Sequence, residues 1–516
     1  MPDIPAKAPP GQRRRGQLWG LAVPPRHWRG RTAAGGGMIG DLVSNKRDGF
    51  WYVLCLIATP LLLARLGLSP AQTLAVAGFC IVLYGAIFFW KYRLAFACFG
   101  IFLLLATGLL DVPHLIEFAG LDIILFLIAM MTIIGFLEEH HFFEWVIDHL
   151  LLVVGPHPRR IMVVMMALAA VSAALVDEVT SILFIVAAML NLLGRAKVNP
   201  IPFILMLVFT TNIGSSATVV GNPVGVIIAL RSGLTFLDFI RWATPISIVC
   251  LSLTIWICLA LFAKDIRKLK PILTGQKGER RLEAMAEEDR LTRRWVRICG
   301  WLFGGVILGL VFHHPAEHAL GLARNTMLLG IALLGAGVAL AISGEKARVL
   351  VEKRVDWWTL AFFLLLFASV GTLKQTGVTQ VLAARLIELS GGSVPLLTSL
   401  FGWSSWLLTA VMDNVPAVAT FVPIVNDVAA AGLSTFPLWW AMLMGGTLGG
   451  NATLIGSTAN IVAAGVLERR ELGAITFAQW LKPGLIVAIT TMLLATLLIL
   501  AQLSLMPAAV SPSALH

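Results

Sequence analysis

The sequence has few charged side chains and few cysteines. Of its 516 residues only 13% are charged, compared with about 25% in typical soluble proteins, whereas 58% are hydrophobic. Long apolar runs recur along the chain, so this balance excludes an ordinary soluble domain and predicts one polytopic membrane protein. The six cysteines lie in or beside apolar segments without the spacing of metal ligands. We therefore expect neither a disulfide framework nor a transition-metal site.

The net charge of +11 is concentrated in two segments. Residues 1–48 hold nine basic and three acidic side chains, and residues 264–294 hold ten and six. Both flank apolar spans, which the positive-inside rule explains without a nucleic-acid partner. We expect a multi-pass protein of the cell (inner) membrane, in contact with the lipid bilayer, with its N-terminus in the cytoplasm. The first 37 residues are rich in Pro, Gly and Arg and are expected to be disordered, and Met38 is an alternative start.

Nine segments are long and apolar enough to cross about 30 Å of hydrocarbon. They are residues 50–68, 72–90, 94–110, 121–137, 240–263, 296–312, 325–342, 357–374 and 482–506. The short loops between them agree with one topology, in which basic loops lie inside and acidic loops lie outside.

Four further apolar stretches do not read as simple spans. Residues 158–194 and 394–431 carry acidic residues in the middle, and residues 200–230 and 438–466 are interrupted by small and polar residues. These stretches form two pairs, since Gly214–Gly221 matches Gly449–Gly456 at an offset of 235 residues, and Asp177 matches Asp413 at 236. Two motifs that recur in the same order at nearly the same spacing indicate an internal duplication.

Each half is predicted to contain five crossings and one re-entrant hairpin, so the second half enters the membrane inverted relative to the first. Inverted repeats with broken helices at the bilayer midplane are typical of secondary transporters. The predicted fold is all-α, with about eleven transmembrane segments, two re-entrant hairpins (158–194 and 394–431) and two broken helices (200–230 and 438–466). The predicted organisation is a tail (1–48), an extra transmembrane helix (49–68), a first repeat (69–264), a cytoplasmic basic linker (265–295), a second repeat (296–506) and a C-terminal tail (507–516).

The interrupted segments are candidates for an ion or substrate site. Irregular backbone at membrane depth is tolerated where it is buried in protein or lines a wet cavity, and glycine allows a helix to unwind. The helix-break glycines are Gly214, Gly221, Gly449, Gly450 and Gly456. The candidate neutral ligands are Thr211, Asn212, Ser215, Ser216, Thr218, Asn222, Thr447, Asn451, Thr453, Ser457, Thr458 and Asn460. The alternative is that these small residues merely permit close helix packing.

Acidic residues at the two hairpin tips are the more specific indication of function. A carboxylate at the bilayer centre costs about 3 kcal/mol or more, yet Asp177, Glu178 and Asp413 occupy these tips, with Asn414 beside Asp413. We expect Asp177 and Asp413 to couple transport to Na⁺ and/or H⁺, with Glu178 as a further ligand and no other cofactor. The alternative is that an Asp only caps its hairpin turn.

Three other groups suggest weaker alternatives. The runs Glu138–His141 and His313–His318 contain metal-ligating residue types, but both fall in predicted loops at the membrane edge, so we interpret them as solvated interfacial groups. Trp295/Trp301, Trp357/Trp358 and Trp439/Trp440 lie near predicted span ends, where tryptophan anchors a protein in the interface.

The hairpin tips and the segment Gly450–Asn460 resemble the ion transporter superfamily, in particular its arsenite permease/sodium–proton antiporter D (ArsB/NhaD) group of citrate-transporter-like permeases. The resemblance covers roughly residues 50–506. It implies a scaffold domain that forms a homodimer and a transport domain, built from the hairpins and broken helices, that moves as an elevator. Dicarboxylate symporters of this superfamily carry Ser-Asn-Thr at each tip, and only Asn414 matches here, so the acidic tips look more like the antiporter and arsenite branches.

The function predicted from these features is secondary active transport, with proton-coupled exchange of sodium or another monovalent cation as the first choice. The alternative of the same fold is a permease for arsenite, another oxyanion or a carboxylate anion, so the substrate is a small inorganic ion or a small anion. A polytopic membrane enzyme is a remote alternative, because the sequence contains neither His-Glu-x-x-His nor Gly-x-Ser-x-Gly. We therefore predict that the protein is not an enzyme.

Overall fold

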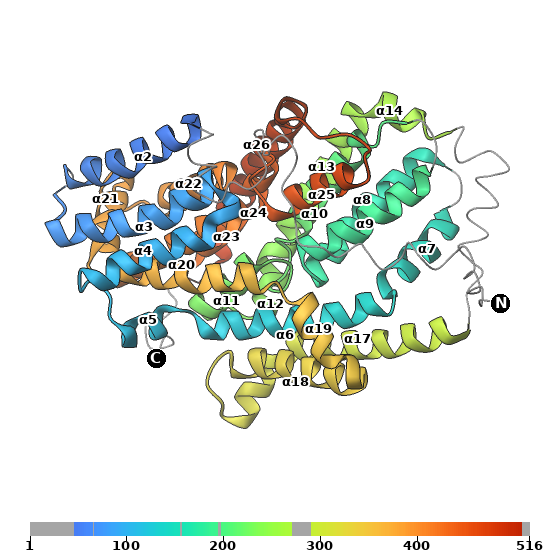
Figure 1. The fold of residues 1–516 in the computed structure, drawn as a ribbon, viewed down its shortest axis with the longest axis horizontal. Helices are drawn as coiled ribbons and strands as arrows, with labels where there is room; N and C mark the ends of the chain where they lie inside the picture. The colour runs from blue at the N-terminus through green and yellow to red at the C-terminus, as the bar shows by residue number, and fades with distance from the viewer. Residues whose placement is uncertain (1–45, 66, 155–156, 195–197, 271–289, 508–516) are drawn as a thin grey trace, which may run out of the picture.

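The computed structural model describes residues 46–65, 67–154, 157–194, 198–270 and 290–507. Most of the predicted N-terminal tail with Met38, residues 271–289 of the predicted linker and nearly all of the C-terminal tail lie outside the described residues. Every regular element of the described chain is a helix (Figure 1). The prediction of an all-α polytopic protein is therefore confirmed.

The first half of the described chain runs from α2 to α14. Its elements are α2 (Lys46–Ala64), α3 (Pro70–Phe88), η2 (Trp90–Tyr92), α4 (Arg93–Ala106), α5 (Val112–Phe118), α6 (Leu121–Glu139), α7 (Phe142–Val154), α8 (Pro158–Leu175), α9 (Glu178–Leu193), α10 (Ile201–Gly214), α11 (Pro223–Ser232), α12 (Phe236–Asp238), η3 (Phe239–Ala243), α13 (Thr244–Leu261) and α14 (Ala263–Arg267).

The second half repeats this order from α17 onwards. Its elements are α17 (Arg290–Leu320), α18 (Thr326–Ser343), η4 (Gly344–Lys346), α19 (Ala347–Arg354), α20 (Trp357–Gln375), α21 (Val378–Ser390), α22 (Val394–Val411), α23 (Asn414–Ala430), α24 (Phe436–Leu448), η5 (Gly449–Asn451), α25 (Thr458–Arg469), α26 (Phe477–Gln502) and η6 (Leu503–Leu505).

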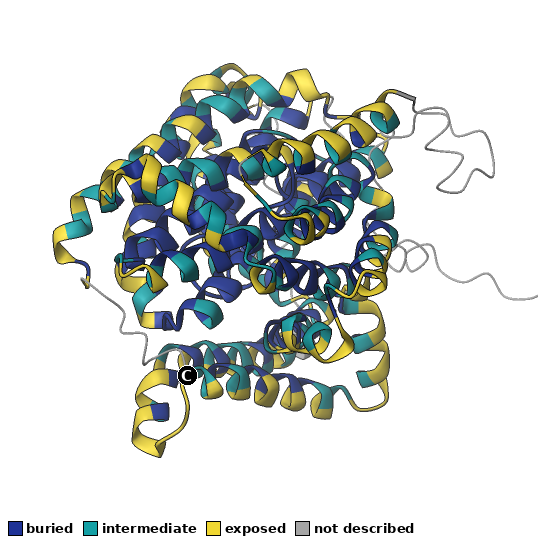
Figure 2. Cartoon of the chain, turned by 90° about the vertical axis from the view of Figure 1, so that its left-hand side faces the viewer, coloured by how far each residue is buried: buried dark blue, intermediate teal, exposed yellow. Residues whose placement is uncertain are grey.

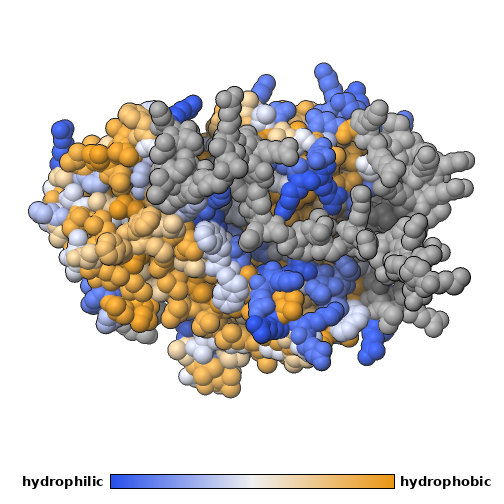
Figure 3. Space-filling model, viewed as in Figure 1, coloured by the Kyte–Doolittle hydropathy of each residue, from blue (hydrophilic) through white to orange (hydrophobic). Residues whose placement is uncertain are grey.

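Ten helices of the described chain are long and apolar enough to cross a membrane. They include α8 and α22, the first arms of the two hairpins, because length and composition alone do not separate a hairpin arm from a span. They do not include α4, whose 14 residues span only about 21 Å. Large apolar side chains such as Leu334 and Leu497 are exposed, and apolar residues cover much of the surface (Figure 3). A surface of this kind fits lipid.

The two acidic stretches form helical hairpins, as predicted. Helices α8 and α9 are joined by residues 176–177, and α22 and α23 by residues 412–413. The hairpins lie on opposite sides of the centre of Figure 1, with α8 and α9 to the right and α22 and α23 to the left. Their tips meet, since Nδ2 of Asn414 donates a hydrogen bond to Oε1 of Glu178 at 2.9 Å. Figure 2 shows the buried residues gathered in the interior of the molecule.

Both predicted broken helices are interrupted, over shorter stretches than the sequence indicated. The first is unwound over residues 215–222, between α10 and α11. The second passes through η5 and is irregular over residues 452–457, before α25. Thr211, Asn212 and Thr447 therefore belong to regular helix, because consecutive apolar residues hold α10 and α24 in the core up to the break.

Two expectations about interfacial residues are wrong. His313 and Glu317 are buried inside α17, which continues to Leu320 instead of ending near residue 312. Glu317 is held there because its Oε1 accepts a hydrogen bond from the backbone N–H of Met327, at the start of α18, at 2.8 Å. Trp439 and Trp440 are core residues, since α24 begins inside the protein, where Trp440 packs edge-to-face on Phe239.

The run Glu138–His141 also differs from the solvated loop that the sequence predicted. Glu138 and Glu139 end α6 and form ion pairs with Arg354 of α19, at 3.1 and 3.2 Å. The side chain of Glu138 is only 12% exposed. His140 packs against Trp295, with ring centroids 4.1 Å apart. These residues therefore connect helices that lie far apart in the sequence.

Candidate functional site

Glu178 lies where both hairpins and both broken helices meet. It is the first residue of α9, and its side chain is 3% exposed. Oε1 accepts hydrogen bonds from Nδ2 of Asn414 at 2.9 Å and from Oγ of Ser457 at 3.2 Å. Oε2 accepts from Oγ of Ser215 at 3.1 Å. One carboxylate thus contacts the second hairpin tip and the breaks of both broken helices.

Glu178 and Asn414 occupy equivalent positions in the two repeats, 236 residues apart. Because they contact each other directly, the site brings equivalent positions of the two repeats together. An acidic residue of one repeat meets an amide of the other. The duplication has therefore produced a single asymmetric carboxylate at the centre.

Asp177 lies next to Glu178 and has a different role in the structure. Its Oδ1 accepts hydrogen bonds from the backbone N–H groups of Val179 at 2.7 Å and Thr180 at 2.9 Å. This is the geometry of a helix N-cap, so Asp177 caps α9. The capping alternative, raised from the sequence for a tip aspartate, describes the contacts of Asp177.

Asp413 does not cap its own helix through its side chain. Its Oδ1 accepts hydrogen bonds from the backbone N–H of Thr458 at 3.0 Å and from the hydroxyl of Thr458 at 3.1 Å. Thr458 is the first residue of α25, where an anion is favoured by the helix dipole. Asp413 thus joins the second hairpin tip to the second broken helix, and it is 4% exposed.

Three buried asparagines connect the two broken helices to each other. Nδ2 of Asn212 donates to Oδ1 of Asn451 at 2.8 Å and to Oδ1 of Asn460 at 2.9 Å. Asn451 donates in turn to the carbonyl oxygen of Phe209 at 3.2 Å. Oδ1 of Asn212 is buried and accepts no hydrogen bond from the described residues. Buried acceptors in native proteins are nearly always paired, and an amide oxygen is a ligand that hard cations prefer.

Thr218 and Thr453 form equivalent links between each break and its own hairpin. The hydroxyl of Thr218 donates to the carbonyl oxygen of Ala174 in α8, and that of Thr453 to the carbonyl oxygen of Ala410 in α22 at 2.6 Å. Each threonine satisfies a carbonyl near the C-terminal end of the first hairpin arm, which has no partner within its own helix. Their hydroxyl groups are thus used for structural contacts.

Gly214 and Gly449 are required for close packing, since neither has a positive φ. A Cβ on Gly214 would overlap the carbonyl oxygen of Ala170 in α8, and a Cβ on Gly449 would lie 2.7 Å from the carbonyl oxygen of Trp406 in α22. Gly221 and Gly456 are similarly close to the backbone of their own breaks, and Gly450 less so. For these glycines the packing alternative raised from the sequence describes what the structure shows.

Four other candidate residues make no hydrogen bond to Glu178. The hydroxyl groups of Thr211 and Thr447 bond to carbonyl oxygens of their own helices, Leu207 and Leu443. Ser216 bonds to Ser247 of α13 at 2.7 Å. Asn222 caps α11 through the N–H of Gly225 and donates to Oγ of Ser215 at 2.9 Å. It therefore helps to position Ser215, which contacts Glu178.

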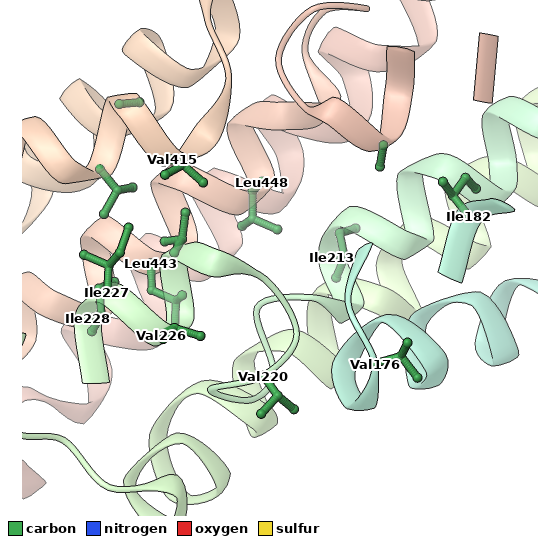
Figure 4. Packing of buried hydrophobic residues seen from close by; sticks show 14 of the residues in the cluster. Val176, Ile182, Ile213, Val220, Val226, Ile227, Ile228, Val415, Leu443 and Leu448 are labelled. Atoms are coloured by element: carbon green, nitrogen blue, oxygen red, sulfur yellow. The ribbon is translucent and has the colours of Figure 1, made fainter. Parts of the chain in front are cut away.

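Apolar side chains surround these polar contacts. Figure 4 shows Val176 next to the first tip, Ile213 at the end of α10, and Val415 at the second tip near Leu448 of α24. All are buried. A water-poor surrounding of this kind strengthens electrostatic interactions at the site.

Two polar contacts at the site's periphery were not recognised from the sequence. Arg93, the first residue of α4, is buried, and Arg231 of α11 pairs with Asp122 of α6. In the sequence Arg93 stands beside Lys91 in a short basic loop, where it is indistinguishable from a marker of topology. Only the fold shows that its side chain is buried.

The sequence profile of the citrate transporter family (CitMHS) matches residues 83–445, well over half of the chain. The chain belongs to this family. Two relatives from Mycobacterium tuberculosis (strain ATCC 25618 / H37Rv), the uncharacterized transporters Rv2684 and Rv2685, are both 33% identical. The first is aligned over 73% of this chain and 85% of its own length, and the second over 82% and 96%.

More distant proteins are also similar to this citrate transporter family member. The human P protein is 25% identical over 72% of this chain and 52% of its own length. The crystal structure of the Alcanivorax borkumensis YdaH transporter aligns with a TM-score of 0.52 at 15% identity, covering 78% of this chain and 88% of that one. Family and relatives show that the protein is a membrane transporter and not an enzyme.

Proposed function

We propose that this transporter exchanges a monovalent cation such as Na⁺ for protons, and that Glu178 is the group that binds either ion. The observation that carries the proposal is the position of Glu178, a buried carboxylate held by both broken helices and both hairpin tips. Among the described residues, no Lys or Arg nitrogen lies within 4.0 Å of a carboxylate oxygen of Glu178, Asp177 or Asp413, so none of the three forms an ion pair. A buried carboxylate without a paired cation requires a proton or a bound cation for neutrality.

The neighbours of Glu178 can serve both states. When Glu178 is ionised, the hydroxyl groups of Ser215 and Ser457 donate to it; when it is protonated, the same hydroxyl oxygens can accept. With a cation bound, rotation of these hydroxyl groups presents oxygen lone pairs beside the carboxylate oxygens. The free Oδ1 of Asn212 is a further oxygen ligand on the same broken helix.

The arrangement of the helices supports an elevator-type movement as part of this proposal. The hairpins, broken helices, α13 and α26 pack on one another, while α3, α4 and α20, and α6, α17 and α18, form a second group; the two groups meet where α20 packs on α23 and α6 packs on α11. The second group would form the scaffold and the interface of a homodimer in the inner membrane, with the N-terminus in the cytoplasm. The first group would carry Glu178 across the membrane.

A second candidate function is a permease for a carboxylate anion, arsenite or another oxyanion, the substrates of the wider fold. It is favoured by the family's description as citrate transporters. The amide and hydroxyl groups of Asn414, Ser215 and Ser457 are donors that an anion also needs. Glu178 at their centre opposes an anion at short range, so we place this function second.

The experiment uses purified protein in liposomes that contain a pH-sensitive dye. Na⁺, Li⁺, arsenite and citrate are added in turn, and proton movement is recorded for the wild type and for Glu178→Gln. Glutamine preserves the contacts, because its oxygen can accept from Asn414 and Ser457 and its amide can donate to Ser215. We expect cation-driven proton movement in the wild type and none in Glu178→Gln.

Glu317→Gln is the matched control, since Glu317 is an equally buried carboxylate in α17, outside both hairpins and both broken helices. It should transport as the wild type does. A wild-type protein that moves protons with citrate or arsenite and ignores Na⁺ and Li⁺ would establish the second candidate function instead.

A further inference from the structure

Trp90 of η2 forms one wall of a small cavity beside the second hairpin tip. The other walls come from α3, from the tip and from the second broken helix, and include Ala86, Ile87, Met412, Asp413, Ile455 and Ile461. The volume of about 10 Å³ is close to the minimum that one water molecule needs. Apart from the carboxylate of Asp413, the walls are apolar or aromatic. The passage past Trp90 is therefore nearly closed.

The cavity lies directly behind the residues that hold Glu178. Asn414 follows Asp413 in the chain and donates to Oε1 of Glu178 at 2.9 Å. Thr458 donates to Asp413 at 3.1 Å, and the residue before it, Ser457, donates to the same Oε1 at 3.2 Å. Two short routes thus lead from the cavity wall to the central carboxylate.

Trp90 is held in place by Arg93, the first residue of α4. Cζ of Arg93 lies 3.9 Å from the ring centroid of Trp90, and Arg93 is 6% exposed. Nη2 of Arg93 donates to Oγ1 of Thr359 at 2.6 Å, and that hydroxyl donates to Oδ2 of Asp356 at 2.6 Å. A cation over the face of tryptophan is the strongest form of the cation–π interaction. A chain of contacts therefore runs from the cap of α20 to the indole of Trp90.

This chain of contacts lies within one group of helices. Helices α3, α4 and α20 pack on one another and lie side by side in Figure 1, and η2 connects α3 to α4. The opposite walls of the cavity, with Met412 and Asp413, belong to the group that would carry Glu178. Trp90 is thus a wall fixed to the scaffold, past which the second tip would move.

We propose that Trp90 closes the ion site on this side of the membrane and that Arg93 is the residue that positions its indole. A hydrated cation does not fit into a cavity of this size, and apolar walls oppose a cation that has lost its water. Hydrophobic constrictions close ion pathways in the same way. Arg93 acts through Trp90 and is a positioning residue. The identity of the ion rests on the proposed function, whereas the contacts of Trp90 do not.

Access to the tip is tested by cysteine labelling of the purified full-length protein. Met412→Cys places a thiol in the cavity, and mass spectrometry separates its labelling by a charged thiol reagent from that of the six native cysteines. Labelling should be slow with Trp90 present and fast in Trp90→Ala. Trp90→Phe keeps an aromatic face for Arg93 and should label slowly. Trp301→Ala, at a tryptophan of α17 that is 83% exposed, is the matched control and should change nothing.

The role of Arg93 is tested in the same assay. The cation–π contact should favour the closed position of the indole by about two- to thirty-fold, and Arg93→Gln should raise the labelling rate by a factor in this range. In the Trp90→Ala background Arg93→Gln should add nothing, because it acts through Trp90. An Arg93→Gln variant that lowers Tm and leaves the labelling rate unchanged would overturn the positioning role.

Equal labelling in Trp90→Ala and in Met412→Cys alone would overturn the closure by Trp90. If Trp90→Ala is not recovered as a folded protein, Trp90→Leu provides the same comparison, because leucine is smaller and offers no aromatic face. An Arg93→Gln effect that persists in full without Trp90 would show that Arg93 acts elsewhere.

The consequence for transport is tested in liposomes with a pH gradient and without Na⁺. In Trp90→Ala the site stays open on this side while it also opens to the other side during the cycle, so protons should leak. The wild type and Trp301→Ala should not leak. A tight Trp90→Ala protein would contradict the proposal. Faster labelling in Trp90→Ala, in a protein whose wild type moves no protons with Na⁺ or Li⁺, would refute the proposed function and leave the closure by Trp90 standing.

Discussion

At the residue scale, Asp177 and Glu178 are neighbours in the chain with different surroundings. Asp177 turns its carboxylate back onto the backbone of α9, whereas Glu178 extends its own toward the second repeat. Asp177→Asn should therefore keep proton coupling, because asparagine is as good an N-cap as aspartate. Asp177→Ala should lower the stability by about 1 kcal/mol, the typical cost of a lost cap. Liposome transport and thermal unfolding of both variants check this, and loss of coupling in Asp177→Asn would return Asp177 to the transport site.

The two threonines at the breaks should be important for stability more than for ion binding. Thr218→Val and Thr453→Val keep the shape but leave the carbonyl oxygens of Ala174 and Ala410 without a partner. Each should cost about 1–3 kcal/mol, while the ion dependence of transport by the folded protein stays unchanged. The serine variants at the same positions should behave like the wild type. A changed Na⁺ dependence in a stable valine variant would show that the hydroxyl group binds the ion.

The sequence was sufficient to place the acids at the hairpin tips, but not to rank them. One residue separates a cap from a central ligand, and the choice depends on how the turn orients the first residues of α9. The offset of 236 residues that pairs Asp177 with Asp413 also pairs Glu178 with Asn414. Because Glu178 and Asn414 differ in residue type, the sequence comparison did not single out this pair, although it forms the central contact.

At the element scale, Gly214 and Gly449 allow each broken helix to contact the first arm of its hairpin. Gly214→Ala should destabilise the protein by more than about 1–3 kcal/mol, the usual range for overpacking, because a backbone carbonyl obstructs the new methyl group. Gly449→Ala should have a smaller effect, since its nearest atom is 2.7 Å away. Gly337→Ala in α18 is the control, because nothing lies within 4 Å of its added Cβ. Equal thermal stability of all three variants would contradict this account.

Most elements could be predicted from hydropathy and duplication. Acids in the middle of apolar runs indicated the hairpins, and clustered small polar residues indicated the breaks. The extension of α17 through His313 and Glu317 could not be predicted, since it depends on a hydrogen bond to the start of α18. The buried position of Trp440 also depends on tertiary packing.

At the scale of the whole molecule, an ion pair joins the two groups of helices. Nη1 and Nη2 of Arg231 in α11 lie 2.7 and 2.9 Å from the carboxylate oxygens of Asp122 in α6. An elevator movement of α11 relative to α6 would break this pair in every cycle. Both side chains are about one-third exposed, so we expect the pair to contribute about 0.2–1 kcal/mol.

Removing this pair with Arg231→Gln or Asp122→Asn should therefore change the initial transport rate by up to about five-fold. The charge-swapped variant Asp122→Arg/Arg231→Asp should return toward the wild-type rate. Arg385→Gln, in an exposed pair within α21, is the control. Identical rates in all these variants would indicate that α6 and α11 do not separate during transport.

The central claim is that one carboxylate binds either a proton or a cation, and proton release on cation binding tests it most directly. Calorimetry of Na⁺ binding to the purified protein, in buffers of different ionisation enthalpy, measures the protons released. The account predicts that Na⁺ binding releases protons in the wild type and in Glu317→Gln, and that this release is lost in Glu178→Gln. Na⁺ binding without proton release, or release that persists in Glu178→Gln, would contradict it.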